Sequence, residues 1–288
     1  MRPIRTISVF PVLLTLGNLV CGFFAIVVAA RVDTPKPEDF APPAVVRDGE
    51  TAERAAAEQD DLRNVMISGW LIFLAMVFDG LDGYVARLSR TASDFGAQLD
   101  SLCDVVTFGV AAGFLLVKMC PRFTIVHSDT IWIIAAAFAA CAALRLARFN
   151  VETGDEDEHL QFTGLPSPAA AAAIASFAIM FYYLRRPNNP LMYAANIDAV
   201  LQSILPFFGV LVALLMVSRI PYPHVVNEIF RGQRSFAHVV AVLFAFVTVM
   251  VIRGYAIPII FSVFVFYGPV RFCWEKVVQR RHQEESLF

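Results

Sequence analysis

DGLDGYVARLSRTASDFGAQLDSLCD, residues 79–104, contains four carboxylates within two segments that otherwise have the apolar composition of membrane-spanning helices. A charged side chain in the hydrocarbon of a bilayer costs at least ~2.5 kcal/mol. Four such groups close together therefore require a partner that compensates their charge. The rest of the chain indicates what that partner is.

The composition is that of an integral membrane protein. Hydrophobic residues make up 58% of the 288 residues and charged residues 17%, against about 25% in an average soluble domain. The net charge of −2 gives no sign of a nucleic-acid partner. The five cysteines lie singly in or beside apolar runs, without metal-ligand or redox spacing, so we interpret them as packing residues.

Apolar runs long enough to span a bilayer predict an all-α, polytopic helical bundle of about eight transmembrane helices. Six or seven spans remain possible, because Arg253 and Gly254 interrupt the last two runs. The first run continues without a convincing cleavage site, so we expect a retained anchor rather than a signal peptide. The predicted spans cover residues 9–30, 65–88, 96–118, 130–149, 167–184, 198–217, 236–252 and 254–272.

Arginine and lysine positions predict the orientation. Arg2 and Arg5 place the N-terminus in the cytosol, and eight spans return the C-terminus there. Arg185 and Arg186 then fall outside, as exceptions to this rule. We expect a catalytic core over 1–184, an external polar insertion at 31–63, further helices over 185–272, and a cytosolic tail at 273–288. Within the insertion, 49–64 is either a solvated linker or a short polar helix.

The four carboxylates converge on one site. Asp79 and Asp82 are three residues apart and share a helix face, as do Asp100 and Asp104, four apart. In an antiparallel hairpin with its turn near residue 91, Asp82 lies level with Asp100 and Asp79 with Asp104. The two spans are therefore predicted to be direct neighbours with carboxylates at two adjacent levels.

Converging carboxylates repel one another unless some are protonated or cations lie between them. Oxygen ligands without histidine or cysteine favour Mg²⁺, Mn²⁺ or Ca²⁺. Two metals bridged by carboxylates suit phosphoryl displacement on a diphosphate. The alternatives are helix-end carboxylates in interfacial water, or the cation path of a transporter or channel. The outer halves of both spans are apolar, which disfavours a path across the bilayer.

Small residues and one arginine accompany the carboxylates. Gly83, Ala86 and Gly96 would let a ligand or another backbone approach closely, although helix packing alone could explain them. Arg87 suits a phosphate oxygen, with a cytosolic topology signal as the alternative.

This pattern resembles the signature of the CDP-alcohol phosphatidyltransferase family: Asp79-x2-Asp82-Gly83-x2-Ala86-Arg87-x8-Gly96-x3-Asp100-x3-Asp104. The resemblance implies a six-helix core, a homodimer, and displacement of CMP from a CDP-linked lipid by an alcohol. The four aspartates would hold two divalent ions, Mn²⁺ or Mg²⁺. Asp104 would be the catalytic base, or it would only orient the hydroxyl. CDP-diacylglycerol would contact Gly83, Ala86, Arg87 and Gly96.

A second region bears on the acceptor alcohol. RLARFN (145–150) ends the fourth span, and FTGLPSPAAAAA (162–173) begins the fifth. Ser167 before Pro168 predicts an N-cap with proline at the first helical position. A helix N-terminus beside Arg145 and Arg148 would form an anion site for a phosphate or an amino-acid carboxylate. Ordinary capping with cytosolic arginines is the alternative.

These stretches, and TLGNLVCGFFAI (15–26), resemble the phosphatidylserine synthase branch of that family. The implied reaction is CDP-diacylglycerol plus L-serine giving phosphatidylserine and CMP, in a bacterial inner membrane with the site facing the cytosol. Sister acceptors (glycerol phosphate, inositol phosphate or choline) remain alternatives. Thr15 and Asn18 would contact the nucleotide, or form helix–helix hydrogen bonds. The serine or phosphate site would comprise Arg145, Arg148, Asn150, Gly164, Pro166 and Ser167.

Overall fold

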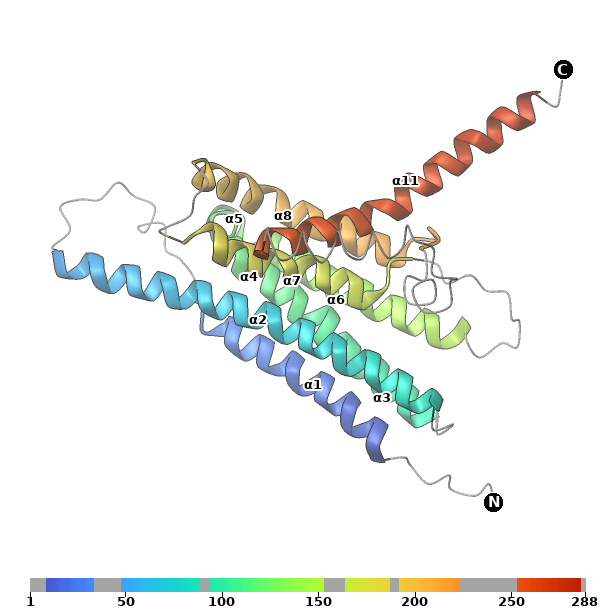
Figure 1. Cartoon of the computed structure of the whole chain (residues 1–288), viewed down its shortest axis with the longest axis horizontal. Helices are drawn as coiled ribbons and strands as arrows, with labels where there is room; N and C mark the ends of the chain where they lie inside the picture. Colours follow the sequence, from blue (N-terminus) through green and yellow to red (C-terminus); the bar gives the residue numbers. More distant parts are fainter. Residues whose placement is uncertain are drawn as a thin grey trace.

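The protein is a bundle of helices packed side by side (Figure 1). The computed structural model describes residues 9–33, 48–88, 94–152, 164–186, 192–222 and 253–285. The elements are α1 (Val9–Ala30), α2 (Asp48–Leu88), α3 (Asp94–Asp104), the π-helix η2 (Val105–Ala111), α4 (Ala112–Met119), α5 (Pro121–Val126), α6 (Ser128–Glu152), α7 (Ser167–Leu184), α8 (Ala194–Val217), the 3-10 turn η3 (Arg253–Tyr255) and α11 (Ala256–Glu285).

Seven helices in the described ranges are long and apolar enough to cross a membrane, with α3, η2 and α4 forming one continuous span. The predicted polytopic all-α membrane protein is thereby confirmed. Seven of the eight predicted spans correspond to these helices, and α7 has the predicted bounds 167–184. The eighth, 236–252, lies outside the described residues.

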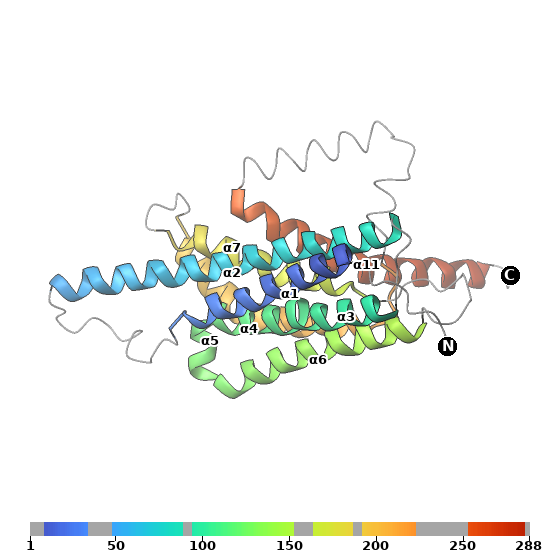
Figure 2. The same ribbon diagram turned by 90° about the horizontal axis from the view of Figure 1, so that it is seen from below.

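Two helices continue beyond the predicted membrane spans, for the same physical reason. α2 begins at Asp48 and continues without a break into the membrane span, so the linker interpretation of 49–64 fails. α11 likewise continues through the expected tail to Glu285. The first extension is rich in Ala and Glu and the second in Glu, Gln and Arg, which are good helix formers, and neither contains a proline. Figure 2 shows α2 and α11 extending beyond the bundle at opposite ends.

α7 is the central helix of the bundle, and it packs against α2, α4, α8 and α11. Its alanines make this close approach possible: Ala170, Ala171 and Ala173 are fully buried. On α2, a Cβ at Gly69 would lie 2.9 Å from the backbone oxygen of Ala175. The small residues therefore bring backbones into contact around the helix that begins beside the carboxylates.

The cysteines are free, and Cys21, Cys103 and Cys120 are buried in the core, as expected of packing residues. Burial raises the pKa of the Cys120 thiol to about 12. Cys273 is exposed on α11.

Arg185 and Arg186, at the end of α7, contact neighbouring side chains. Arg185 Nε forms a 2.7 Å ion pair with Asp198 Oδ1, and its guanidinium lies 4.5 Å from the ring centroid of Phe181. Arg186 stacks on Tyr182 and donates to its hydroxyl. Both arginines therefore have contacts within the protein, and their predicted external position stays a prediction.

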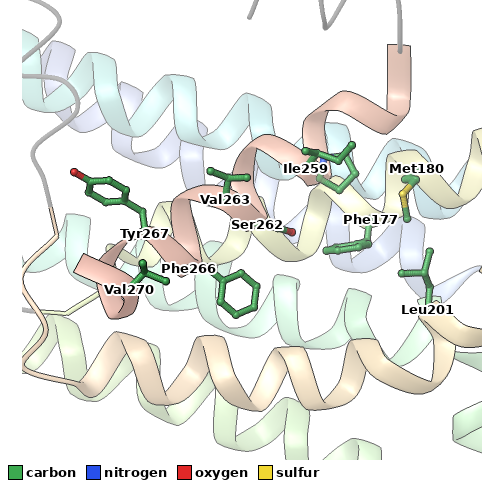
Figure 3. Close-up of a pocket in the computed structure, with 10 residues that line it drawn as sticks. Phe177, Met180, Leu201, Ile259, Ser262, Val263, Phe266, Tyr267 and Val270 are labelled. Carbon is green, nitrogen blue, oxygen red and sulfur yellow. The ribbon is translucent and has the colours of Figure 1, made fainter. Parts of the chain in front are cut away.

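An apolar pocket of about 560 Å³ lies between α7, α8 and α11 (Figure 3). No carboxylate of the 79–104 stretch lines it, so it is separate from the polar site described next. Its walls include Phe177, Met180, Leu201, Ile259, Val263 and Phe266.

Candidate active site

Three of the four carboxylates converge between α2 and α3. Asp79, Asp82 and Asp100 each offer an oxygen, and these oxygens all lie within 4.8 Å of one another. Asp82 is buried, and the other two are partly buried. The predicted convergence of the two helix faces is therefore confirmed in the structure.

Asp104 lies beside this group rather than within it. Its Oδ1 accepts a 2.9 Å hydrogen bond from Asn18 Nδ2, and its carboxyl group also contacts that of Asp79. The contact agrees with the predicted pairing of Asp79 and Asp104 at one level. Asp104 is only 6% exposed, so it faces the protein interior.

α1 contributes to the site in a way the hairpin argument missed. It packs against both α2 and α3, whereas α2 and α3 approach each other less closely than either approaches α1. α2 packs against η2 and α4 of the third span, so the two spans are neighbours, as predicted, while α1 makes the closer contact with α2 and α3. α1 supplies Asn18, which binds Asp104, and Thr15, whose side chain contacts Asp82. Both residues thus make helix–helix contacts, and their predicted nucleotide contacts stay predictions.

The span changes from α-helix to π-helix directly after Asp104. π-helical turns are rare and frequently occur at functional sites. Thr107, in this segment, donates its hydroxyl to the Asn18 carbonyl at 3.2 Å. Gly22 leaves no space for a Cβ beside Thr107. Asn18, which binds Asp104, is therefore fixed both by its place in α1 and by the hydrogen bond from η2.

Orphaned polar atoms mark the centre of the site. In the described part of the chain, four buried side-chain atoms lack a hydrogen-bond partner, and all four belong to this region: Asn18 Oδ1, Asp82 Oδ2, Asp100 Oδ1 and Arg145 Nε. A buried polar group without a partner costs about 1–3 kcal/mol, and more if charged. These three acceptors and one donor are therefore available to a bound ligand.

The donor set fits a hard divalent cation. The unpartnered acceptors are all oxygens, and they accompany a cluster of three carboxylates. Such ligands suit Mg²⁺ or Mn²⁺ better than softer metals. The remaining orphan, Arg145 Nε, is a donor and suits an anion.

Space for a ligand exists next to the carboxylates. A Cβ built on Gly83 would meet nothing within 4 Å, so this glycine borders open space rather than a packed helix. Gly96, one turn before Asp100, is partly buried. Ala86 and Arg87 lie in α2, but their side chains are outside the described set, so their predicted nucleotide contacts remain predictions.

Arg145 joins the acceptor region to the carboxylates. Its Nη1 donates to Ser167 Oγ at 3.0 Å, and its guanidinium interacts electrostatically with Asp104 and Asp79. The prediction that Ser167 is the N-cap is wrong, because Ser167 is the first residue of α7. Pro166 occupies the cap position, because its extended backbone ends the preceding segment, and the Ser167 hydroxyl makes no capping bond.

The other predicted acceptor residues lie nearby with structural partners. Asn150 exchanges hydrogen bonds with Ser101, the residue after Asp100. Arg148 Nη1 donates to the Val217 carbonyl at 3.4 Å. Gly164 has φ +90°, a conformation that favours glycine, and donates to the Ile220 carbonyl. Arg145 is therefore distinguished from them by its electrostatic interaction with Asp104 and Asp79.

Comparisons with known proteins agree with this geometry. Residues 8–215 match the family described as CDP-alcohol phosphatidyltransferase. A protein of Methanocaldococcus jannaschii named CDP-diacylglycerol–serine O-phosphatidyltransferase is 40% identical over 160 residues, which cover 56% of this chain and 65% of that protein. A Helicobacter pylori protein of the same name is 31% identical, covering 70% and 78%. An archaetidylserine synthase of Methanothermobacter thermautotrophicus is 36% identical, covering 54% and 57%.

Proposed function

The chain belongs to the CDP-alcohol phosphatidyltransferase family, and we propose that it transfers the phosphatidyl group of CDP-diacylglycerol to the hydroxyl of L-serine. The products would be phosphatidylserine and CMP. The observation that carries the acceptor assignment is Arg145, a partly buried cation with an unpartnered Nε, next to both the carboxylates and the start of α7. The names of the relatives support the same acceptor.

Asp79, Asp82 and Asp100 would hold the divalent ions, with Asp104 at the edge of the group. When bound, two such ions, Mn²⁺ or Mg²⁺, neutralise the diphosphate and lower the pKa of a nearby hydroxyl. The open space at Gly83 would admit the diphosphate beside these carboxylates. Gly96, Ala86 and Arg87 would complete the contact with CDP-diacylglycerol.

Asp104 is the carboxylate best placed to receive a proton. A carboxylate fully engaged with cations is a weak base, and Asp104 is the one outside the three-carboxylate group. Asn18 Nδ2 donates to its Oδ1 and fixes the carboxyl group, which also contacts that of Asp79. In the proposed step, the serine oxygen bonds to the β-phosphorus, the bond from that phosphorus to the CMP oxygen breaks, and the hydroxyl proton passes to Asp104.

Arg145 would bind the carboxylate of serine through its free Nε. A zwitterionic acceptor needs one anion site, whereas a phosphorylated acceptor calls for several cations. Arg148 is partly occupied by the Val217 carbonyl, so Arg145 is the better candidate. The start of α7 adds positive potential from its helix dipole on the same side.

An acceptor panel tests this assignment. Purified protein in detergent, with CDP-diacylglycerol and Mn²⁺ or Mg²⁺, is given serine, glycerol 3-phosphate, inositol phosphate or choline separately. We expect CMP release and a new phospholipid with serine, and at most a few per cent of that rate with the others. Release of CMP with another acceptor but not with serine would exclude the serine assignment. Acceptor-independent uptake of cations into vesicles would favour the transporter alternative.

Metal removal is expected to abolish the reaction. Chelation with EDTA, followed by desalting, should lower serine-dependent CMP release to background, because the clustered carboxylates then repel the diphosphate. Adding back Mn²⁺ or Mg²⁺ should restore CMP release. Zn²⁺ should not, since the atoms that would bind the metal are all oxygens. Full activity of the metal-free protein, with residual metal checked by elemental analysis, contradicts the metal role.

The proposal also includes the setting of the enzyme. It would be a homodimer in a bacterial inner membrane, with the carboxylates open to the cytosol. The family match ends near the end of α8, and α8 contacts the Gly164 turn, which argues for a catalytic core that extends beyond the boundary predicted at 184. α11 lies outside the matched residues.

A further inference from the structure

The acceptor region rests on the segment that follows α8. Gly164 N donates to the Ile220 carbonyl at 2.9 Å, and Leu165 N donates to the Leu215 carbonyl at 3.0 Å. Leu165 is fully buried. Two backbone hydrogen bonds thus join the turn before α7 to the end of α8 and the residues just after it.

This junction has no spare space. Gly164 adopts φ +90°, and a Cβ there would lie 2.5 Å from the Met216 carbonyl oxygen and 2.9 Å from that of Ser218. Two residues further along the turn, Pro166 leads into Ser167, whose hydroxyl accepts the bond from Arg145. A displacement of the 218–222 segment would therefore move the turn that carries the partner of Arg145.

Tyr222 fastens this segment to α11. It is 7% exposed, and its hydroxyl donates to the Val265 carbonyl at 2.9 Å. Burial raises its pKa to about 12, so the hydroxyl keeps its proton at neutral pH. The ring lies against Gly268 of α11, where a Cβ would be 2.5 Å from the Tyr222 Cζ atom.

We propose that Tyr222 is a positioning residue for the acceptor site. It clamps the 218–222 segment on α11, and the segment in turn fixes Gly164, Leu165 and the start of α7 beside Arg145. This inference rests on the proposed function in assigning the acceptor to Arg145. It gives α11, which lies outside the family match, a role in acceptor affinity.

Tyr222→Phe tests the clamp, because it removes the hydroxyl and keeps the ring. We expect the KM for serine to rise about 3- to 10-fold, the range of one lost hydrogen bond. The KM for CDP-diacylglycerol and kcat should stay within about twofold. A merely structural role would lower the yield or Tm of the variant without separating the two KM values.

Two glycines of α11 and η3 supply a matched pair. Gly268→Ala forces a Cβ onto the Tyr222 ring and should raise the serine KM as Tyr222→Phe does. Gly254→Ala forces a Cβ onto the ring of Tyr183, which belongs to the opposite end of α7 from the acceptor turn. It should loosen α11 to a similar degree, lower Tm, and leave the serine KM unchanged.

Amide hydrogen exchange gives a readout that needs no turnover. In Tyr222→Phe, the peptide containing Gly164 and Leu165 should exchange faster, while α1 and α2 peptides exchange as in the wild type. Unchanged exchange there, or equal increases of both KM values, would overturn the clamp. A wild type without serine-dependent CMP release, combined with faster exchange in the variant, would instead contradict the proposed function and leave the clamp supported.

Discussion

Asparagine in place of Asp100 is expected to reduce serine-dependent CMP release at least about 1000-fold. The substitution keeps the size of the side chain but removes one negative charge from a group of three carboxylates within 4.8 Å. It also replaces an oxygen ligand by an NH₂ donor or leaves only one oxygen. A loss of about 4 kcal/mol of stabilisation corresponds to that factor, at 1.36 kcal/mol for each tenfold change in rate. Initial rates at saturating substrates measure it.

Asp60→Asn is the matched control, since Asp60 lies on α2 and is exposed, away from the cluster. Its activity should remain within twofold of the wild type. Size-exclusion elution and Tm should show that Asp100→Asn is folded; removing one of several repelling charges should if anything raise its stability without metal. A folded Asp100→Asn with more than a tenth of wild-type activity would refute the role of this carboxylate.

Replacing Arg145 with Ala is expected to lower kcat/KM for serine by about 100-fold, with most of the loss in the KM for serine. Its free Nε is the donor available to an acceptor carboxylate, and charge-assisted hydrogen bonds of this kind are worth about twice neutral ones. Arg145→Lys should recover only part of the loss, because an ammonium cannot bind a carboxylate in two parallel bonds and also hold Ser167. Steady-state kinetics with varied serine measure the split.

Arg186→Ala controls for the loss of a cationic side chain. Arg186 stacks on tyrosines near the end of α7 far from Ser167, so its loss should leave both KM values unchanged. If the serine KM of Arg145→Ala is unchanged, or if the CDP-diacylglycerol KM rises instead, Arg145 does not bind the acceptor. Its role would then be to bind the lipid phosphate.

The carboxylate geometry could be predicted because it depends on counting alone. Residue spacing along two antiparallel helices fixed which aspartates share a face, and the structure brings Asp79, Asp82 and Asp100 together. Span bounds were also accessible, since hydropathy ends abruptly at caps such as the Pro166 turn before α7. Both inferences use local periodicity, which does not depend on the rest of the fold.

The features that the sequence did not reveal depend on tertiary packing. Nothing local indicates that α1 packs against both carboxylate helices, so the Asn18–Asp104 bond was open to another interpretation. The π-helix after Asp104 has no residue signature, and the close approach of Gly22 to Thr107 is visible only in the folded chain. Gly164 was predicted to contact the ligand. In the structure, a side chain at this position would collide with the carbonyl oxygens of Met216 and Ser218.

The central claim, that the aspartates of α2 and α3 form a divalent-metal site, is tested most directly by Mn²⁺ binding. Electron paramagnetic resonance of free Mn²⁺ during titration of the detergent-purified protein counts bound ions without requiring turnover. We predict two ions for each wild-type chain, with tighter binding when CDP-diacylglycerol is added, and a loss of at least one ion in Asp100→Asn but none in Asp60→Asn. Equal Mn²⁺ binding by wild type and Asp100→Asn would contradict the account.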